Sequence, residues 1–413
     1  MLAEQNIQEQ GTVEIGWLEE GLREALMQMG TRLMGEMLTS VSDRDIPSDQ
    51  RRELERRHRR TRTLHTVMGV VEFERDYYWC PECTRIPFDE ELGIQGEAFS
   101  PGTRKMMGYA ASQGSYMEAS EDLRRLAGLH ISDHSIQREV QKTAGSLQAF
   151  IENLPPEKTD SPLPVLYVSL DGTGAPMRKE VLEGRKGKQA DGSAKTREVK
   201  VGCIYDQPKG AQTPQRASYI ANFSTAEAFG ADLLREARRR GLGRATTRVV
   251  LGDGAHWIWE LARINFPGSI EILDYYHATE HLHELIRSML GSQECSLASV
   301  TKQWEQWLWD GAIPLIIQEA QRLLLNAVDR ETAKREIEYF RKNITRMKYE
   351  LFRQSGLDIG SGRVEAACRT VVGERLKRSG MFWSLPGAEN ILTFRCAVMN
   401  HQYDDFWEQY RAA

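Results

Sequence analysis

The sequence is poor in cysteine and has no long uninterrupted run of apolar residues. Six cysteines are spread over 413 residues, and only Cys80 and Cys83 lie close together, which argues against a disulfide framework and for reduced thiols. No stretch reaches the roughly 20 apolar residues that a membrane-spanning helix needs. The N-terminal sequence MLAEQNIQEQ also lacks the basic and apolar segments of a signal peptide. These absences predict a cytoplasmic protein that does not enter a membrane.

The length of the chain exceeds that of one average domain, which is about 100 to 200 residues. A chain of 413 residues therefore predicts two or three domains, each large enough to bury its own core. No internal repeat or low-complexity tract is evident, so a solenoid is not expected.

Positive charge is concentrated in a few segments, although the formal net charge of the chain is −5. Residues 51–62 contain seven Arg against two Glu, residues 178–200 eight Lys or Arg against four acids, and residues 235–244 five Arg against one Glu. Any one of these runs is compatible with a solvated surface. Three of them, together with a basic helix at residues 369–378, favour a nucleic acid as partner, because local patches attract phosphates.

The first 100 residues combine a helical pattern, an alternating pattern and a pair of cysteines. The pattern predicts a helical region over residues 13–60 and then a β-hairpin at about 61–79 that turns at Gly69. The next segment, CPECTRIPFDEELG, holds Cys80 and Cys83 at the spacing of half a zinc ribbon. A structural zinc needs four ligands and no second pair follows, so a turn with two free thiols is the alternative.

The segment at residues 101–150 is helical in pattern and has the layout of a helix-turn-helix. An amphipathic helix at about 117–127 is followed by a turn at Gly128 and by Ser132, a residue type that caps helix N-termini. Such helix pairs read DNA in many proteins, and they also occur as plain packing units. In the DNA-reading interpretation the groove-facing residues are Ser135, Gln137, Arg138 and Lys142.

After a linker rich in proline and polar residues at 154–164, the pattern changes to alternating strands and helices. Three apolar runs end in a carboxylate: VLYVSLDG in Asp171, RVVLGDG in Asp253 and IEILDYYH in Asp274. A helical stretch then extends from about 278 to 355. This order predicts an α/β sheet followed by an all-helical region.

Asp171 and Asp253 occupy positions at which α/β proteins bind ligands, namely directly after the carboxyl ends of strands. Each is followed by Gly, which allows a sharp turn and leaves room for a metal ion or substrate. An Asp-Gly pair after a strand is also an ordinary turn. Two such pairs with a further acid on a late helix favour one shared site for phosphoryl transfer, because Mg²⁺ prefers carboxylate oxygens.

That late helix, GSGRVEAACRTVVGERLKRSGMFW at residues 360–383, contains two acids, Glu365 and Glu374. In an α-helix nine residues correspond to half a turn beyond two full turns, so the two side chains are predicted on opposite faces. Only one of them can enter the site. Glu365 lies at the start of the helix, directly after Gly360 and Gly362, and is the better placed of the two.

Four blocks of the sequence together resemble a known family. They are SLDGTGAPM with EGRKGKQADGSAKTREVKVGCIY, then VLGDGAHWIWELA, then the strand end DYYH, and finally GLDIGSGRVEAACRTVVGERLKRSGMFW. In this order they look like the insertion-sequence DDE transposases of the ISKra type, which are related to the Mutator-like and hAT-like transposases. The resemblance covers about residues 60–410 and implies an α/β fold with an RNase H-like core, in which a mixed sheet is flanked by helices.

The catalytic triad of this family carries over onto Asp171, Asp253 and Glu365. The resemblance implies that these three residues bind two Mg²⁺ or Mn²⁺ ions. The interval of 112 residues before the last acid (365 − 253) is similar to that of relatives with an all-helical insertion at this place. Asp274 and His277 form a D-x-x-H that resembles the family's C/D-x-x-H motif. For this auxiliary pair we favour shaping of the site or DNA contact over metal binding.

The sequence patterns and the resemblance together predict a division of the chain, in which the first 60 residues are predicted from their pattern alone. The expected parts are an N-terminal helical region (1–60), a β-hairpin with a zinc-ribbon-like segment (61–100), a helix-turn-helix-like DNA-binding domain (101–153), a linker (154–164), the first part of the RNase H-like core (165–277), an all-helical insertion (278–355), and the final catalytic helix with C-terminal helices (356–413).

Enzymes of this family bind terminal inverted repeats, cleave DNA at the ends of their element and join the 3′-OH to target DNA. The resemblance therefore implies a DNA transposase that acts on the bacterial nucleoid, as a homodimer or a larger assembly. The expected DNA contacts are Arg178, Lys179, Arg185, Lys186, Lys188, Arg369, Arg375, Lys377 and Arg378, together with Arg138 and Lys142.

Two other functions are compatible with parts of the sequence. A domesticated, transposase-derived protein would bind DNA without cutting it, but the presence of all three acids argues against that interpretation. A metal-independent hydrolase such as a glycosidase would use paired carboxylates, and it leaves the basic segments unexplained. Cleavage of DNA in the presence of a divalent ion separates the three hypotheses.

Overall fold

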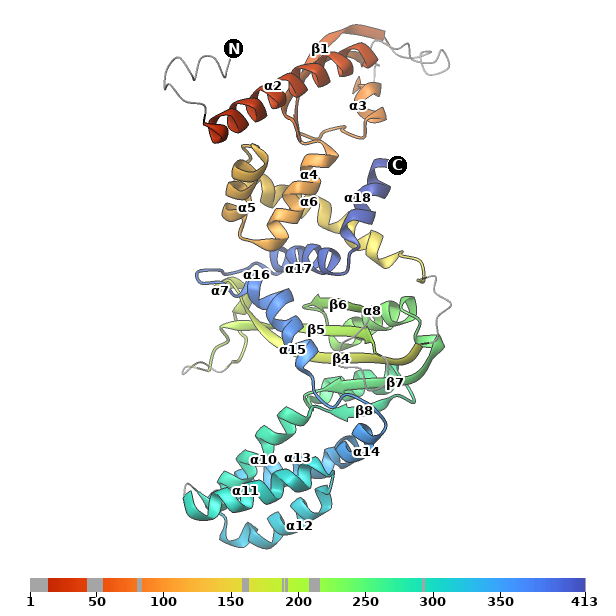
Figure 1. Ribbon diagram of the computed structural model, residues 1–413. Coiled ribbons are helices and arrows are strands. Elements are labelled where there is room, and N and C mark those ends of the chain that lie inside the picture. The colour runs from red at the N-terminus through yellow and green to blue at the C-terminus, as the bar shows by residue number, and fades with distance from the viewer. Residues whose placement is uncertain are drawn as a thin grey trace. The chain divides into compact units, whose positions relative to one another are not determined.

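The structure of the protein is a computed structural model (Figure 1). It describes residues 14–42, 55–79, 84–157, 163–187, 189, 192–207, 216–291 and 294–412. The chain divides into two compact units. Unit 1 consists of Met1–Thr143 and Tyr403–Ala413, and unit 2 consists of Ala144–Gln402. Among the helices in the described ranges, none combines the length and the apolar character that crossing a bilayer requires.

Unit 1 contains a long helix, a three-stranded antiparallel sheet of order β1-β2-β3 and a group of further helices. Its elements are α2 (Ile15–Ser42), β1 (Glu55–Thr66), β2 (Gly69–Trp79), β3 (Thr84–Arg85), α3 (Pro87–Glu91), α4 (Pro101–Gln113), α5 (Tyr116–Asp122) and α18 (Tyr403–Ala412). The helix α6 (Asp133–Glu152) begins in unit 1 and ends in unit 2.

The predicted β-hairpin is confirmed. β1 and β2 pair in antiparallel fashion up to Thr66↔Gly69, and Gly69 has a φ of 117°, which lies in the region that favours glycine. One face of the hairpin packs against α2. The buried residues of this core are Leu64, Val71, Phe73, Phe88 and Ile94, and Met34, Leu38, Val41 and Leu92 pack against them.

The prediction of helix up to residue 60 is wrong at its end, because residues 55–66 form the strand β1. The Arg-rich run therefore ends on a sheet, and one of its members serves the fold. Arg62 donates to the buried carboxylate of Asp89 at 2.7 Å, and Arg75 from β2 donates to the same carboxylate at 3.2 Å. Two guanidinium groups on one buried acid supply the pairing that a buried charge requires.

The predicted helix-turn-helix elements are also present in unit 1. After α5 and a π-helical turn over Leu123–Ala127, Gly128 adopts a φ of 70° and ends the first helix. The Ser132 hydroxyl accepts a hydrogen bond from the Ser135 amide at 3.2 Å, at the start of α6. The chain thus folds locally as the sequence predicts, since a left-handed glycine and a capping serine bracket the turn.

Unit 2 is built around a mixed five-stranded sheet of order β6-β5-β4-β7-β8. β4 pairs with β5 and β5 with β6 in antiparallel fashion, whereas β4, β7 and β8 run parallel. The strands are β4 (Leu163–Pro176), β5 (Thr196–Asp206), β6 (Arg216–Asn222), β7 (Ala245–Gly252) and β8 (Ile270–Leu273). The predicted linker at 154–164 is thus too long by two residues, because Leu163 and Pro164 belong to β4.

Helices cover both faces of this sheet. On β5, a Cβ at Gly202 would meet Leu233 and Phe229 of α8 (Ala226–Arg239), whereas the ring of Tyr205, three residues later, lies 4.9 Å from the guanidinium of Arg363 on α15 (Gly362–Ala367). Because successive residues of a strand face opposite sides, α8 and α15 lie on opposite faces. The remaining helices of this part are α7 (Lys179–Leu182), α8 (Ala226–Arg239), α9 (His256–Asn265), α15 (Gly362–Ala367), α16 (Glu374–Leu376) and α17 (Leu385–Met399).

The stretch predicted to be helical, residues 278–355, consists mainly of helices where the structure describes it, and these helices form a bundle (Figure 1). Two phenols join this bundle to the sheet: Tyr349 donates to the carbonyl of Leu273 at 3.0 Å, and Tyr339 donates to that of Asp253 at 3.4 Å. The bundle is therefore anchored at the ends of β7 and β8. Its helices are α10 (Tyr275–Leu290), α11 (Glu294–Trp309), α12 (Ile313–Leu323), α13 (Arg330–Asn343) and α14 (Tyr349–Gln354).

The late helix is not one continuous α-helix. α15 is followed by a π-helical segment over Cys368–Gly373 and then by α16. A π-helical turn contains an extra residue and so rotates the residues after it relative to their positions in a regular α-helix. The predicted phase between Glu365 and Glu374 therefore does not apply. Glu374 is held by an ion pair with Arg395 at 2.7 Å.

Candidate functional site

Three acidic residues lie at equivalent register positions of neighbouring parallel strands. In the register of the sheet, Leu170 of β4 pairs with Gly252 of β7, and Gly252 pairs with Leu273 of β8. The next residue on each strand is an acid: Asp171, Asp253 and Asp274. Because paired residues of parallel strands lie side by side, these three acids form one row at the carboxyl edge of the parallel strands. We call them the acid row.

Asp171 does not end its strand, contrary to the sequence-based expectation. β4 continues to Pro176 and remains paired with β5, so the Asp171-Gly172 pair is not a turn. Asp171 instead marks the point at which the pairing of β4 with β7 stops. The backbone of Asp171 is therefore held by pairing with β5 on one side. On the other side, the pairing with β7 has already ended.

The half-buried carboxylate of Asp171 has weak hydrogen-bond support. One oxygen accepts from the amide of Gly172 at 2.6 Å, and the other accepts from the thiol of Cys368 at 3.2 Å. Burial raises the pKa of Asp171 and the neighbouring Asp253 carboxylate raises it further, although both hydrogen bonds and His277 act in the opposite direction. The two hydrogen bonds and His277 therefore only partly offset the unfavourable effect of burial and of the Asp253 charge on the ionised form of Asp171.

Asp253 lies in a true turn at the end of β7. Its carboxylate accepts from the amide of Ala255 at 2.9 Å, and Gly254 adopts a φ of 100°. A Cβ at Gly254 would meet the Tyr339 hydroxyl at 3.0 Å and Leu273 at 3.1 Å, so the glycine is required both by its conformation and by the packing. The Asp-Gly pair here has the backbone geometry that the sequence suggested.

Asp274 is fully buried and well bonded. One oxygen accepts from the amide and from the ring Nδ1 of His277, at 2.9 and 2.8 Å, and the other accepts from the amide of Ser361 at 2.6 Å. Burial acts to raise the pKa of Asp274, but these hydrogen bonds outweigh it and the net shift is downward. The hydrogen bond between the Asp274 carboxylate and the His277 ring raises the pKa of His277 to about 9. The pair is therefore an ionised carboxylate with an imidazolium near neutral pH.

Glu365 lies in the same region as Asp274 but comes from a late helix and not from the end of a strand. It lies on the first turn of α15, it is exposed, and its carboxylate accepts from the Ser361 hydroxyl at 2.6 Å. Ser361 thus bonds Asp274 through its amide and Glu365 through its side chain. Sequence analysis missed Ser361. Its place between two glycines, one residue before the helix, is the signal that could have identified it.

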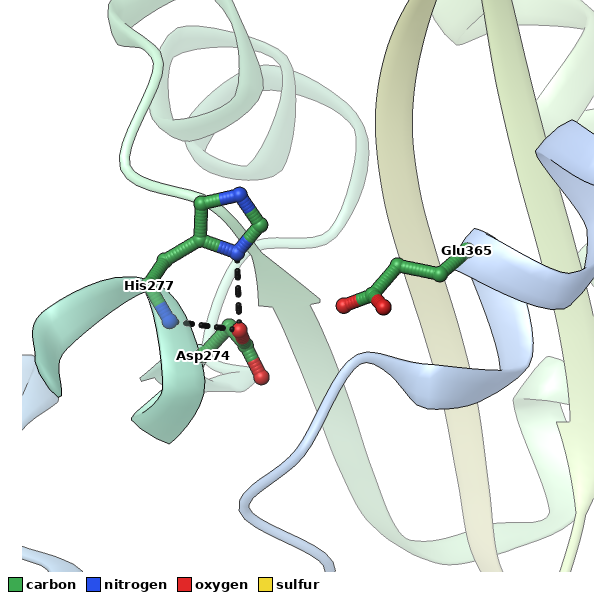
Figure 2. Close-up of side chains that lie close together, drawn as sticks. All are labelled: Asp274, His277 and Glu365. Atoms are coloured by element: carbon green, nitrogen blue, oxygen red, sulfur yellow. Dashed lines mark hydrogen bonds and ion pairs between the residues drawn. The ribbon is translucent and has the colours of Figure 1, made fainter. Parts of the chain in front are cut away.

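Asp274, His277 and Glu365 face one another in Figure 2, and one ligand atom from each lies within 4.8 Å of the others. Within the described ranges this is the group of three His, Cys, Asp or Glu side chains that satisfies this distance. Asp171 and Asp253 are not members of the group, which differs from the triad implied by the resemblance. The acid row and Glu365 are nevertheless connected, because Cys368 bonds Asp171 and lies one helical turn after Glu365.

The charges of this site are strongly unbalanced. Four carboxylates converge on it, and in the described part of the chain Asp171, Asp253 and Glu365 form no ion pair with Lys or Arg. His277 is the cation that lies among them. An oxygen-rich cluster with excess negative charge suits a hard divalent cation, so the residues present fit Mg²⁺ or Mn²⁺.

One predicted DNA contact is wrong. Arg375 is fully buried, and its guanidinium lies 4.9 Å from the centre of the Trp383 ring and donates to the Met381 sulfur at 3.8 Å. The π-helical turn before α16 directs it inward, away from solvent. Trp383 is also buried and donates its indole N–H to the carbonyl of Leu376, so it belongs to the core.

The other predicted basic contacts that the structure describes are exposed. Lys377 contacts the Thr173 hydroxyl of β4, two residues beyond Asp171, and is thereby close to the acid row. Lys142 forms an ion pair with Glu97 at 2.6 Å. The exposed residues are Arg138, Lys142, Arg178, Lys179, Arg185, Lys186, Arg369, Lys377 and Arg378. Lys188, Cys80 and Cys83 lie outside the described residues.

Comparisons with known proteins cover different parts of the chain. A family model described as "Uncharacterised protein family (UPF0236)" matches residues 9–198, slightly less than half of the sequence. Of the four acids of the candidate site, Asp171 falls inside this match, whereas Asp253, Asp274 and Glu365 lie beyond it. No curated protein matches the sequence.

Two solved structures show distant similarity. One is the Drosophila P element transposase strand transfer complex, with 10% identity over 74% of this chain and 80% of that chain, at a TM-score of 0.29. The other is a crystal structure of NurA bound to dAMP and manganese, with 12% identity over 66% of this chain and 63% of that chain, at a TM-score of 0.12. Scores this low do not establish a common fold.

Proposed function

We propose that the protein is a DNA transposase of the ISKra insertion-sequence type, with an RNase H-like core that performs metal-dependent phosphoryl transfer. The observation that carries this proposal is the acid row, which aligns three carboxylates on adjacent strands, together with Glu365 facing it from α15. A cluster of like charges at the edge of a sheet lowers the stability of the fold. Proteins tolerate such a cluster at sites that bind a cation or catalyse a reaction.

In this proposal Asp171, Asp253 and Glu365 hold two Mg²⁺ or Mn²⁺ ions. Bound there, the ions would activate the attacking oxygen and stabilise the leaving oxygen of a DNA phosphodiester. The chain contributes the fixed positions of the ligands: β4 and β7 hold the two aspartates in register, and Ser361 holds the carboxylate of Glu365. Pre-positioned ligands are needed because small displacements weaken catalysis strongly.

Asp274 and His277 serve as the auxiliary pair. The Nδ1 of His277 is already engaged by Asp274 at 2.8 Å, so it is not free to bind a metal ion in this arrangement. Asp274 also bonds the Ser361 amide, which places the start of α15 relative to β8. The pair therefore fixes the geometry between the sheet and Glu365, and its positive imidazolium offsets part of the negative charge.

DNA is held by exposed basic side chains. Those of unit 2 include Arg178, Lys179, Lys377 and Arg378, which follow β4 or lie on the segment that contacts it. In unit 1, the helix-turn-helix elements would recognise the terminal inverted repeats, with Arg138 among the contacts. Phosphate contacts of this kind predict an affinity that falls steeply with salt concentration.

The experiment that tests the proposal is cleavage and joining of DNA that carries the ends of the element, in Mg²⁺ or Mn²⁺. Wild-type protein should nick the ends and transfer the 3′-OH, and Asp171→Asn or Glu365→Gln should slow both steps about a hundredfold or more while leaving end binding intact. Binding of the ends without cutting under any divalent ion would instead support a transposase-derived DNA-binding protein. Cutting at the wild-type rate by Glu365→Gln would remove that residue from the site.

A further inference from the structure

The helix α2 carries two apolar faces. One face holds Met34, Leu38 and Val41, which pack on the hairpin core. On this side the helix approaches the sheet closely, because a Cβ at Gly35 would lie only 2.5 Å from the carbonyl oxygen of Glu72. This face is therefore fully used by the fold of unit 1.

The second face is exposed and consists of six large apolar side chains. Their exposed fractions are Ile15 71%, Leu22 58%, Leu26 51%, Met29 60%, Leu33 55% and Met37 60%. Single exposed apolar residues are common on protein surfaces, but six on one helix are not. We call this set the α2 stripe.

Helical geometry places the α2 stripe on the side away from the sheet. At about 100° per residue, the six positions fall within an arc of roughly 80°, whose centre is about 160° from Gly35, the residue at which the helix approaches the sheet closely. From Leu22 to Leu33 the separations are four, three and four residues, and Met37 follows four residues later. Alternating steps of three and four, as between Leu22 and Leu33, are the spacing of a coiled-coil seam, in which apolar side chains meet those of a partner helix.

The surface of the stripe is large enough for a specific interface. Six side chains that are each more than half exposed present on the order of 600 Å² per chain, at the upper end of the largest apolar patches of monomers. Two such stripes together would bury about 1,200 Å², which is where specific protein–protein interfaces begin. The helix has 28 residues and is therefore about 42 Å long, enough for several heptads.

We propose that the α2 stripe is a self-association surface, along which α2 of one copy packs against α2 of a second copy. The charges beside the stripe suit an identical partner. Glu19 and Arg23 lie along one border, and Arg32 and Glu36 along the other, where they already form an ion pair at 3.0 Å. Each border thus carries both signs, and a second copy meets no block of like charge.

The surface extends beyond α2 on one side. Arg23 donates to the carbonyl of Leu126, and the Leu126 side chain is 77% exposed. Apolar surface from the π-helical turn thus adjoins the stripe and can add to the same contact. This inference uses the geometry of α2 alone and does not depend on the proposed catalytic function.

The test is sedimentation equilibrium of the full chain over a range of concentrations. Wild-type protein should associate to a dimer, and the double variant Leu26→Glu/Leu33→Glu should raise the dissociation constant at least tenfold. Gln28→Glu is the control for charge, because it adds one negative charge at an exposed position outside the stripe and should behave as wild type. The thermal midpoint of each variant at low concentration checks that the fold is retained.

A second measurement avoids substitution. Oxidation of methionine in the wild-type protein should become slower at Met29 and Met37 as the concentration rises, whereas Met34 on the packed face should not change. A wild-type chain that stays monomeric at all concentrations would overturn the proposal. So would a dimer whose dissociation constant and oxidation pattern do not respond to the glutamate pair.

Discussion

Asp171 on β4 and Asp274 after β8 occupy equivalent register positions of one sheet, but their surroundings differ. Each is the first residue beyond the paired row of Leu170, Gly252 and Leu273. Asp274 is fully buried, with three hydrogen bonds to protein groups and a lowered pKa, whereas Asp171 has a thiol and its neighbouring amide and a raised pKa. Position in the sheet thus brings an acid to the site, and hydrogen-bond partners decide whether it stabilises the fold or remains available for a ligand.

The largest effect should come from Asp171→Asn. We expect DNA cleavage to fall about a thousandfold or more, equivalent to about 4 kcal/mol of transition-state stabilisation, because in the proposed function Asp171 is a metal ligand and loses its charge. Stability should not fall and should rise slightly, since burial and Asp253 disfavour the charged form of Asp171. Single-turnover cleavage and urea denaturation measure the two effects. A variant that loses stability together with activity would contradict the contrast with Asp274.

Asp274→Ala should act in the opposite way, mainly on stability. It leaves the Ser361 amide and the His277 ring without their buried acceptor, which should cost about 3 kcal/mol of unfolding free energy. Urea denaturation measures this loss, and Asp274→Asn, which retains an acceptor oxygen, should be milder. If Asp274→Ala unfolds at the wild-type urea concentration, the assignment of Asp274 as a structural group fails.

The Asp274–His277 pair also gives a pH dependence in the metal-free protein. The pKa of His277 is raised from 6.5 to about 9 in the folded state, so the pair contributes its full stability from pH 6.5 down to the acid range in which the Asp274 carboxylate protonates. This contribution is lost as the pH rises from 6.5 through about 9. Unfolding in EDTA at several pH values measures the slope, and Asp274→Asn should flatten it.

Glu365→Gln tests the acid on the helix separately from the acids on the sheet. Because Glu365 is exposed and its replacement retains an acceptor for Ser361, we expect no loss of stability. Activity should fall about a hundredfold, and the Mg²⁺ concentration needed for half-maximal rate should rise. An unchanged metal requirement would indicate that Glu365 does not bind an ion.

The smallest effects should separate Arg375 from Lys377, which lie close in sequence. Lys377→Met should weaken DNA binding a few-fold and reduce the salt dependence by about one ion, because the lysine is exposed beside β4. Arg375→Met should leave the salt dependence unchanged and lower stability by about 1 kcal/mol, because the guanidinium is buried against Trp383. Binding measured from 50 to 300 mM salt distinguishes the two.

Local signals in the sequence predicted most of the elements. The hairpin around Gly69, the turn between Gly128 and Ser132 and the helical stretch at 278–355 were all predictable, because each depends on residues close together in the chain. The first part of β1, residues 55–60, was not, because its arginine-rich sequence favours no single structure until it pairs with β2. Pairing with residues more distant in sequence decided that segment.

The candidate site was predictable in composition but not in arrangement. Apolar runs that end in acids indicated Asp171, Asp253 and Asp274, yet only the strand register aligns them. The closeness of Asp274 and His277 to Glu365 depends on Ser361, and the inward direction of Arg375 depends on a π-helical turn. Neither feature has a signature in residue periodicity, which assumes regular helices.

The contact between Cys368 and Asp171 joins residues 197 positions apart, and the contact between Ser361 and Asp274 joins residues 87 positions apart. A ribosome adds about 5 to 20 residues per second, so several seconds separate the synthesis of Asp253 from that of Glu365. During that interval the sheet can form while its acids still lack the helix that faces them. The site is thus completed late in biosynthesis, and a nascent chain that has not yet reached Glu365 has no assembled centre.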